Sequence, residues 1–278
     1  MVGRVVVEHC KSIGDEVIGV AHDDLDIANR EAVEQAIGTT APGLIINCAA
    51  WTDVDGCEGN PERAFAANAV GPENLAQASS AHGARLVTIS TDYVFDGEKD
   101  GFYTQHDEPN PQSVYAVSKL EGEARSRTEN KNTIVARTGF VFGPRGNNFL
   151  SKIVERAGSG HTISAINDAY GTPTYARDLA VRLRELGQQN HPGIYHVVNA
   201  GDGVTFEEFA KEALKIAGYR DVEIVSVSMD ELKRPAARPR NSRLRCILSP
   251  EIGLPAMRDW RVGLRDFVER ETNRSLAV

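Results

Sequence analysis

Three polar residues of this sequence have the types and the spacing of a proton-transfer site. Thr91 directly follows the apolar run "ARLVTIS", and Tyr115 and Lys119 stand together in "YAVSK". Tyr115 and Lys119 are one helical turn apart, so they share a face of the helix that we expect over 113–128. A tyrosine with a pKa near ~10 is a poor acid–base group at neutral pH, and a nearby cation favours the phenolate and lowers that pKa. The pattern therefore indicates proton transfer at a substrate oxygen, to which the Thr91 hydroxyl could also hydrogen-bond.

The tyrosine–lysine motif alone is weak evidence for a catalytic site. Such pairs occur by chance in many chains, and a lone pair on a helix is usually a surface feature. Thr91 makes a catalytic site the better interpretation of the pair, because it stands upstream at the end of an expected strand. In open parallel sheets, ligands lie at the carboxyl ends of the strands, so we expect the chemistry just after "INCAA", "VTIS" and "VART".

The elements that position these residues alternate between strand-like and helix-like segments. Buried or β-rich runs occur at 15–20, 43–50, 84–90 and 133–138, and helical patterns occur at 29–38, 60–83 and 113–128. Asn60 and Pro61 are typical of a helix start, and Gly71 with Pro72 should bend or break that helix. The alternation predicts an α/β fold with a doubly wound, parallel, Rossmann-like sheet.

After about residue 147 the rhythm loosens. Helical patterns occur at 147–160, 205–219 and 260–271, a strand-like run occurs at 193–200, and the Pro/Arg-rich stretch 234–245 is expected to be a loop. Thr205 is a candidate cap for the helix that follows it. We infer a second, smaller α+β lobe that is assembled from discontinuous pieces of the C-terminal half.

Composition narrows the classes of protein. A net charge of −8 over 278 residues argues against a sequence-independent nucleic-acid surface. We see no apolar run of ~18 residues, so we expect no membrane span. The cysteines have neither paired nor metal-site spacing, which predicts reduced thiols, a cytoplasmic protein and no metal site. These cysteines are Cys10, Cys48, Cys57 and Cys246.

Several segments together resemble a known family. The segments "INCAAWTDVDGCE", "STDYVFDG", "YAVSKLEGE", "RTGFVFGPRGNNFL", "YGTPTYARDLA" and "RPRNSRL" occur in the family's order and at suitable spacing. With the order Thr91, Tyr115, Lys119, the chain resembles the extended short-chain dehydrogenases/reductases. It is most similar to their dTDP-4-dehydrorhamnose reductase family, from residue 3 to about residue 265.

The resemblance implies an enzyme of nucleotide-sugar and cell-surface polysaccharide biosynthesis. NADPH or NADH would reduce the C4 keto group of a dTDP-4-keto-6-deoxy sugar, turning dTDP-4-dehydrorhamnose into dTDP-L-rhamnose. Tyr115 would protonate the carbonyl oxygen, Lys119 would tune Tyr115 and bind the nicotinamide ribose, and Thr91 would polarise the carbonyl. The resemblance is compatible with a homodimer and with Mg²⁺, although nothing in the sequence indicates the metal.

The resemblance also assigns binding residues and domains. The cofactor-binding positions, besides Tyr115 and Lys119, are Gly3, Asp26, Ile27, Ala49, Ala50, Trp51, Thr52 and Asn68. The substrate-binding positions are Thr91, Asp92, Asn148, Phe149, Arg238 and Asn241. Residues 1–146 plus about 175–200 would form the dinucleotide-binding domain, and about 147–174 plus 201–278 the substrate-binding lobe.

Each of these assignments has a plainer alternative. Trp51 would then simply pack, Asn68 would lie on a helix surface, and Arg238 would be solvated in its loop. Asp26 would cap the following helix, and Asp92 would organise a turn.

The chain departs from the family pattern in several places. Ala169 stands in "NDAYGTPT" where the family usually has an amide, so the exact sugar stays open. No acidic residue directly ends the run at 15–20 and no arginine marks a 2′-phosphate site, which leaves NAD against NADP open. Gly3 resembles the last glycine of the phosphate-binding loop, so the sheet would lack its first strand. We expect that Met1 is an internal residue of that loop; the alternative is impaired cofactor binding.

Two other functions compete with the reductase. A nucleotide-sugar epimerase or 4,6-dehydratase has the same fold, but Tyr93 stands where related dehydratases carry a glutamate. A regulatory binding protein, like the β subunit of methionine adenosyltransferase, also resembles these reductases. The presence of Thr91, Tyr115 and Lys119 together favours an enzyme.

Overall fold

The central sheet is parallel and four-stranded, as expected for the α/β class. The computed structural model describes residues 1–189 and 191–275, with side chains to residue 270. The strand order is β1-β2-β3-β8, and the strands are Leu44–Asn47, Arg85–Thr91, Ile134–Thr138 and Gly193–His196. Every residue of β3 is buried, including Arg137 and Thr138 at its carboxyl end.

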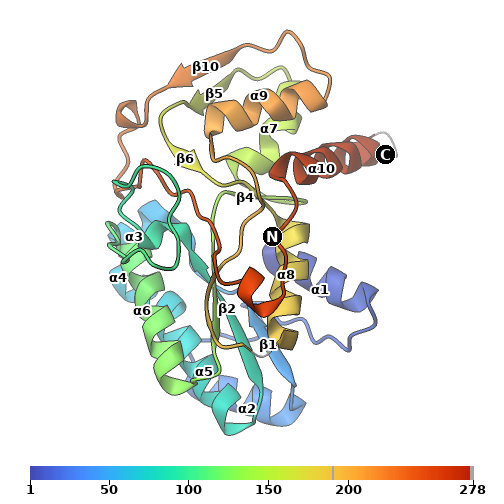
Figure 1. Cartoon of the computed structure of the whole chain (residues 1–278). Coiled ribbons are helices and arrows are strands. Elements are labelled where there is room, and N and C mark those ends of the chain that lie inside the picture. Colours follow the sequence, from blue (N-terminus) through green and yellow to red (C-terminus); the bar gives the residue numbers. More distant parts are fainter. Residues whose placement is uncertain (190, 276–278) are drawn as a thin grey trace.

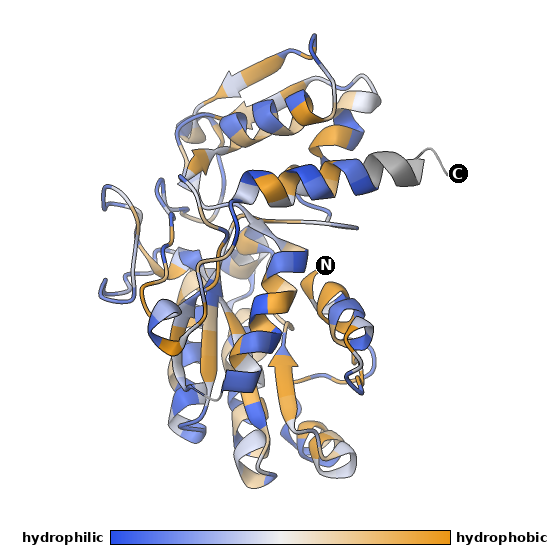
Figure 2. Ribbon diagram, turned by 45° about the vertical axis from the view of Figure 1, so that its right-hand side comes forward, coloured by the Kyte–Doolittle hydropathy of each residue, from blue (hydrophilic) through white to orange (hydrophobic). Residues whose placement is uncertain are grey.

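Helices cover both faces of this sheet (Figures 1 and 2). Val87 and Ile134 face a core shared with α1 (Val2–Ser12) and α8 (Ala176–Gln189). Leu86 faces the opposite core. The helices on that second side are α2 (Arg30–Thr40), α5 (Gly71–Ala81) and α6 (Val114–Glu129). Alternate strand residues thus serve the two layers, as a doubly wound sheet requires.

The strand that we predicted at 15–20 is wrong. These residues form neither helix nor strand, and Ile18 and Val20 are exposed. Among the described strands β1 pairs with β2 alone, and residues 15–20 do not pair with its other edge. The β-rich composition of this segment is therefore not sufficient to make it a strand.

The helical stretch after residue 54 is interrupted, as the glycine–proline pair predicted. The helix α3 (Val54–Gly59) is followed by α4 (Pro61–Phe65), which the Asn60 side chain caps, then by a π-helical turn at Ala66–Val70 and by α5. Proline has no N–H, so Pro72 cannot donate to the carbonyl of Asn68 one turn earlier. The backbone widens at this point, and π-turns of this kind are frequent at functional sites.

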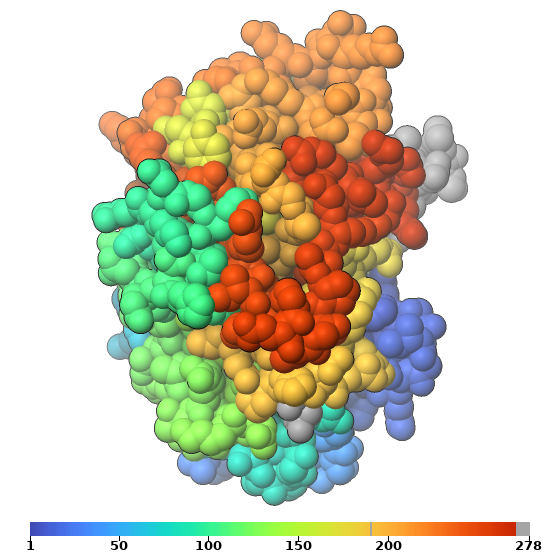
Figure 3. Space-filling model, viewed as in Figure 1, coloured from blue at the N-terminus to red at the C-terminus, as the bar shows by residue number. Residues whose placement is uncertain are grey.

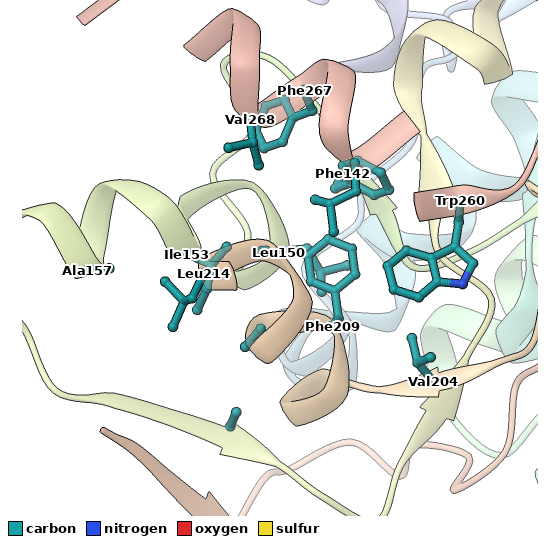
Figure 4. Packing of buried hydrophobic residues seen from close by; sticks show 14 of the residues in the cluster. Phe142, Leu150, Ile153, Ala157, Val204, Phe209, Leu214, Trp260, Phe267 and Val268 are labelled. Carbon is teal, nitrogen blue, oxygen red and sulfur yellow. The ribbon is translucent and has the colours of Figure 1, made fainter. Parts of the chain in front are cut away.

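A second lobe has its own aromatic core (Figure 4). Phe142, Tyr175, Phe209, Trp260 and Phe267 pack together in this core. The helices around it are α7 (Phe149–Gly158), α9 (Phe206–Ile216) and α10 (Trp260–Ser275). Its strands are the parallel pair β5 (Ile163–Ile166) and β10 (Ile224–Val227) and the short strands β4 (Val141–Phe142), β6 (Tyr170–Gly171), β7 (Thr174–Tyr175) and β9 (Val204–Thr205).

Loops join the two parts of the molecule. Thr205 caps α9 through a reciprocal capping box with Glu208, as predicted. The predicted loop at 234–245 is confirmed, and its last residues run alongside Tyr103, whose backbone hydrogen-bonds to Arg243 and Arg245. Figure 3 shows this C-terminal segment packed against the segment around residue 100. In the described part of the chain, no helix is long and apolar enough to cross a membrane.

We predict that Gly122→Ala lowers the free energy of unfolding by about 1–3 kcal/mol, because a Cβ there would overlap the carbonyl oxygen of Asn68. Gly59→Ala is the matched control, since its Cβ would have nothing within 4 Å, and it should change stability by less than ~0.5 kcal/mol. Chemical denaturation measures both. Equal stability of the two variants would contradict the close packing of α6 on the π-helical turn.

Candidate active site

Thr91, Tyr115 and Lys119 come together at the carboxyl edge of the sheet. Thr91 is the last residue of β2, and the first turns of α6 carry Tyr115 and Lys119. All three are buried, with exposed fractions of 5%, 9% and 4%. The Thr91 hydroxyl donates to Asp92 Oδ1 at 3.1 Å and lies close enough to Tyr115 to influence its pKa. The strand end therefore places two hydroxyl groups where one substrate oxygen could contact both.

Burial decides the protonation of Tyr115. Our expectation that Lys119 lowers the pKa of Tyr115 is not met, because desolvation of the buried phenol raises that pKa above its ordinary value. The Thr91 hydrogen bond opposes this rise and is the smaller effect. Tyr115 is therefore a protonated phenol at neutral pH, ready to donate a proton rather than to accept one.

Lys119 is a buried cation with unused donors. Its Nζ donates to the carbonyl of Ile89, 2.7 Å away, and this is its one acceptor among the residues that the structure describes. An ammonium group has three protons, so two remain for a ligand. Burial lowers the pKa of Lys119 to about 8, and the negative charge of Glu123 acts in the opposite direction.

Asp92 is a buried carboxyl beside this pair. Desolvation raises the pKa of Asp92 to about 6, although hydrogen bonds from Ser242 and Thr91 oppose the rise. Gly139, just after β3, leaves no space for a side chain because a Cβ there would overlap the Asp92 carboxyl group. Asp92 therefore does more than organise a turn. It places a carboxyl group at the end of β2, where burial makes its charged form less favourable than in water.

Asn68 holds the chain after β1. Its side chain accepts from Trp51 N at 2.9 Å, and it donates to Trp51 O at 3.0 Å and to Ser118 Oγ at 3.1 Å. Asn68 is fully buried, so it is not a helix-surface residue. The Arg63 guanidinium lies 4.5 Å from the centre of the Trp51 ring. The segment that we expect to pass the cofactor is therefore tied to α6, next to Lys119.

The start of α1 lies close to the end of β1. A Cβ at Gly3 would lie 3.5 Å from Cys48 Cβ, which is ordinary van der Waals contact. The next residue in the chain, Ala49, donates from its backbone to Asn47 Oδ1 at 3.0 Å. Ala50 is half-buried and Thr52 is exposed. A helix N-terminus and the end of a parallel strand thus meet where a dinucleotide fold needs them.

The predicted adenine-side residues lie at the edge of the sheet. Asp26 is exposed and accepts from Ala28 N at 3.0 Å. The cap of α2 is Asn29, so Asp26 does not cap that helix. The Ile27 side chain fills the space beside Gly71, and its carbonyl accepts from Asn74.

Two of the predicted substrate-side residues have local structural roles. Asn148 caps α7, accepting from Ser151 N, and donates to Val141 O at 2.8 Å. The Phe149 ring lies 5.9 Å from that of Phe206, at the edge of the aromatic core. These contacts of Asn148 and Phe149 lie within the second lobe and its connecting loop, and none involves Thr91, Tyr115 or Lys119.

The arginine-rich loop contributes Arg238 and Asn241. Arg238 is half-buried and binds both carboxylate oxygens of Asp55 at 2.9 Å, so it is not a solvated loop residue. Its positive charge also acts on Tyr93, whose ring meets that of Tyr115 edge to face at 6.2 Å. Asn241 donates to Gly101 O at 2.8 Å and to Lys99 O, which fixes the neighbouring loop.

The structure adds residues that sequence reasoning missed. Thr138 ends β3 directly beside Thr91, and its buried hydroxyl has no hydrogen-bond partner among the described residues. Its position at the end of "VART" could have revealed it, because the same rule identified Thr91. Phe140, two residues later, has a left-handed backbone with φ of 50°. Asp55 and the buried pair of Glu123 and Arg137 had no sequence signal, since their partners are distant in the chain.

No cluster of three or more His, Cys, Asp or Glu side chains that could hold a metal ion occurs within the described residues.

Comparisons with known proteins agree with this geometry. The family model for the RmlD substrate binding domain matches residues 1–273. A dTDP-4-dehydrorhamnose reductase of Mycolicibacterium smegmatis is 36% identical over 96% of this chain and 82% of its own length. A crystal structure of a dTDP-4-dehydrorhamnose reductase from Clostridium acetobutylicum matches with a TM-score of 0.92 at 36% identity, over 98% of this chain and 96% of that one.

A second solved structure carries a cofactor. The dTDP-4-dehydrorhamnose reductase of Bacillus anthracis, determined in complex with NADP, matches with a TM-score of 0.92 at 33% identity, over 97% of this chain and 95% of that one. Similarity in sequence and in structure thus extends over nearly the whole chain. The chain belongs to the dTDP-4-dehydrorhamnose reductase family of oxidoreductases.

Proposed function

We propose that this protein reduces the C4 ketone of dTDP-4-dehydrorhamnose with NADPH or NADH and forms dTDP-L-rhamnose. The observation that carries this proposal is the buried pair of Thr91 and Tyr115 beside the buried cation of Lys119. The relatives named above supply the substrate class, and the NADP complex of the Bacillus anthracis protein supplies the cofactor class.

The residues present fit a nicotinamide dinucleotide. Lys119 has two donor protons free for ribose hydroxyls, and the buried hydroxyl of Thr138 lacks a partner among the described side chains. Gly3 at the start of α1 would hold the pyrophosphate, and Asp26 with Ile27 would lie on the adenine side. The segment of Ala49, Ala50, Trp51 and Thr52, held by Asn68, would line the middle of the cofactor.

When bound, the reduced nicotinamide supplies the hydride for C4. The Thr91 hydroxyl donates a hydrogen bond to the substrate carbonyl and orients it. Tyr115, kept protonated by its burial, transfers the phenolic proton to the oxygen as negative charge develops there. Lys119 then lies on the same helical face as the new phenolate and stabilises its charge. Burial excludes water, so each of these interactions is stronger than it would be in solvent.

The remaining substrate contacts follow from position. Asp92 would accept a hydrogen bond from a sugar hydroxyl, and Arg238, fixed by Asp55, would face the diphosphate. Asn148, Phe149 and Asn241 would shape the loops around the sugar and the base.

We propose that residues 1–146 with about 175–200 bind the cofactor and that about 147–174 with 201–278 bind the nucleotide sugar. The two hydrophobic cores support two parts of this kind, but their members cross the proposed bounds: Phe142 and Tyr175 belong to the core of the lobe, and Leu254 and Met257 belong to a core beside the sheet.

We predict that Tyr115→Phe lowers kcat by about 10²–10⁴-fold, because it removes the proton donor and keeps the ring. The wild-type reaction is followed as loss of NADPH absorbance with dTDP-4-dehydrorhamnose. Tyr93→Phe is the control, since it alters the neighbouring buried tyrosine and should cost less than ~10-fold. Full activity of Tyr115→Phe would refute the assignment. A folded wild type that binds NADPH without turnover would favour a regulatory protein instead.

We predict that Asp92→Asn stabilises the protein at pH 7.5 by on the order of 2 kcal/mol. The pKa of Asp92 is raised to about 6 when folded, so the folded protein holds this proton more tightly than the unfolded chain. Stability is therefore highest below the unfolded pKa of ~3.9 and is lost as the pH rises through about 6. The gain from the substitution should shrink at pH ~4.5.

The control for this prediction is Asp96→Asn. Hydrogen bonds from Glu98 N and the Tyr103 hydroxyl lower the pKa of Asp96, so the same substitution there should destabilise the protein at pH 7.5. Urea denaturation at the two pH values measures both variants. A destabilised Asp92→Asn at pH 7.5 would mean that hydrogen bonding, rather than desolvation, dominates at this carboxyl.

A further inference from the structure

A buried ion pair lies one helical turn behind Lys119. Glu123 follows Lys119 by four residues on α6, so the two side chains share a face of the helix. Arg137 reaches Glu123 from β3, with Nη2 2.7 Å from Oε2 and Nε 3.0 Å from Oε1. Both side chains are only 4% exposed.

Further contacts fix the Glu123 carboxylate in place. Ser90, at the residue before Thr91 on β2, donates its hydroxyl to Glu123 Oε1. The guanidinium of Arg137 lies 5.3 Å from the centre of the Phe95 ring. The carboxylate is thus held by two neighbouring strands of the sheet while it sits on the helix that carries Tyr115 and Lys119.

Stability alone is a weak reason for such a pair. Removing two charges from water costs about as much as their attraction returns, and well-packed apolar side chains of similar volume are often equally or more stable. The arrangement does, however, fix the carboxylate of Glu123 one helical turn from the buried ammonium group of Lys119. This placement indicates a role for Glu123 at Lys119.

We propose that Glu123, held by Arg137 and Ser90, is a positioning residue that keeps Lys119 protonated and directed toward the active site. The inference rests on the proposed function of Lys119. An ammonium group buried without a nearby anion loses its proton, because burial disfavours the charged form. A neutral lysine could not stabilise the phenolate of Tyr115 by its charge. It would also bind ribose hydroxyls more weakly than an ammonium group does.

The other charged and titratable groups around Lys119 do not replace Glu123. Cys48, from the segment after β1, faces Lys119, but burial raises the pKa of its thiol and keeps it neutral. Tyr115, on the same helix, is also neutral. Asp92 acts on Tyr115, and the positive charge of Arg137 is paired with Glu123. Among the residues that the structure describes, Glu123 is the one carboxylate that raises the pKa of Lys119, which burial lowers to about 8.

The test compares Glu123→Gln with Glu123→Asp in the full chain. Both variants disturb the pairing with Arg137, but only Glu123→Gln removes the charge. We expect the basic limb of the kcat/KM profile to move by about one pH unit to lower pH in Glu123→Gln. At pH 8, where about half of the wild-type Lys119 is protonated, this variant should lose about fivefold in kcat/KM. Glu123→Asp should keep the limb within ~0.3 pH units of the wild type, even if its overall rate falls.

Asp178→Asn is the matched control, because it breaks another ion pair, with Arg258 Nε at 2.9 Å, away from Lys119. It should lower stability without moving the basic limb. The pH dependence of NADPH affinity, followed by fluorescence, provides a second readout that needs no turnover. Its midpoint should shift in the same direction in Glu123→Gln.

The outcomes separate the two proposals. An unchanged basic limb and an unchanged affinity midpoint in Glu123→Gln, with Lys119→Met inactive, would overturn the inference and leave the proposed function standing. Equal shifts in Glu123→Gln and Glu123→Asp would also overturn it, because the effect would then follow packing rather than charge. A wild type without reductase turnover would refute the proposed function, while the affinity midpoint would still decide the role of Glu123.

Discussion

The parallel pairing of β2 with β3 is the constraint on which the site depends. The register sets Thr91 beside Thr138 at the carboxyl edge and Ser90 beside Arg137 one residue earlier. Because successive residues of a strand point to opposite faces, the hydroxyl pair and the ion-pair layer are separated by a single residue. A shift of β3 by one residue would turn Arg137 to the other face of the sheet, and Glu123 would lose its ion-pair partner.

The packing of α6 completes this arrangement. Pro72 leaves the carbonyl of Asn68 without its usual helical donor, and the π-helical turn at that point allows Gly122 of α6 to approach closely. The same Asn68 side chain holds the backbone of Trp51 and the hydroxyl of Ser118. The segment that would line the cofactor and the helix that carries Tyr115 and Lys119 therefore form one connected unit.

Burial determines the electrostatics of the site. Desolvation raises the pKa values of Tyr115 and Asp92 and lowers that of Lys119, so each group is moved toward its neutral form. A catalyst needs some of these charges, and it can retain them only through fixed counter-charges and hydrogen bonds. Thr91 performs this task for Tyr115 and Asp92, and Glu123 opposes the effect of burial at Lys119.

The sequence by itself determined much about this protein. The alternation of segments predicted the parallel α/β sheet. The rule that ligands lie at strand ends predicted a site at Thr91, which the structure brings close to Tyr115 and Lys119. Cap residues such as Asn60 and Thr205 marked helix starts correctly, because these signals are local in the chain.

Tertiary structure decided the features that depend on residues distant in the chain. The run at 15–20 is not a strand, since pairing requires a neighbour that no local pattern supplies. The rise in the pKa of Tyr115, the pairing of Arg238 with Asp55 and the ion pair behind Lys119 arise from burial and from contacts between segments far apart in sequence, so only the folded structure could establish them.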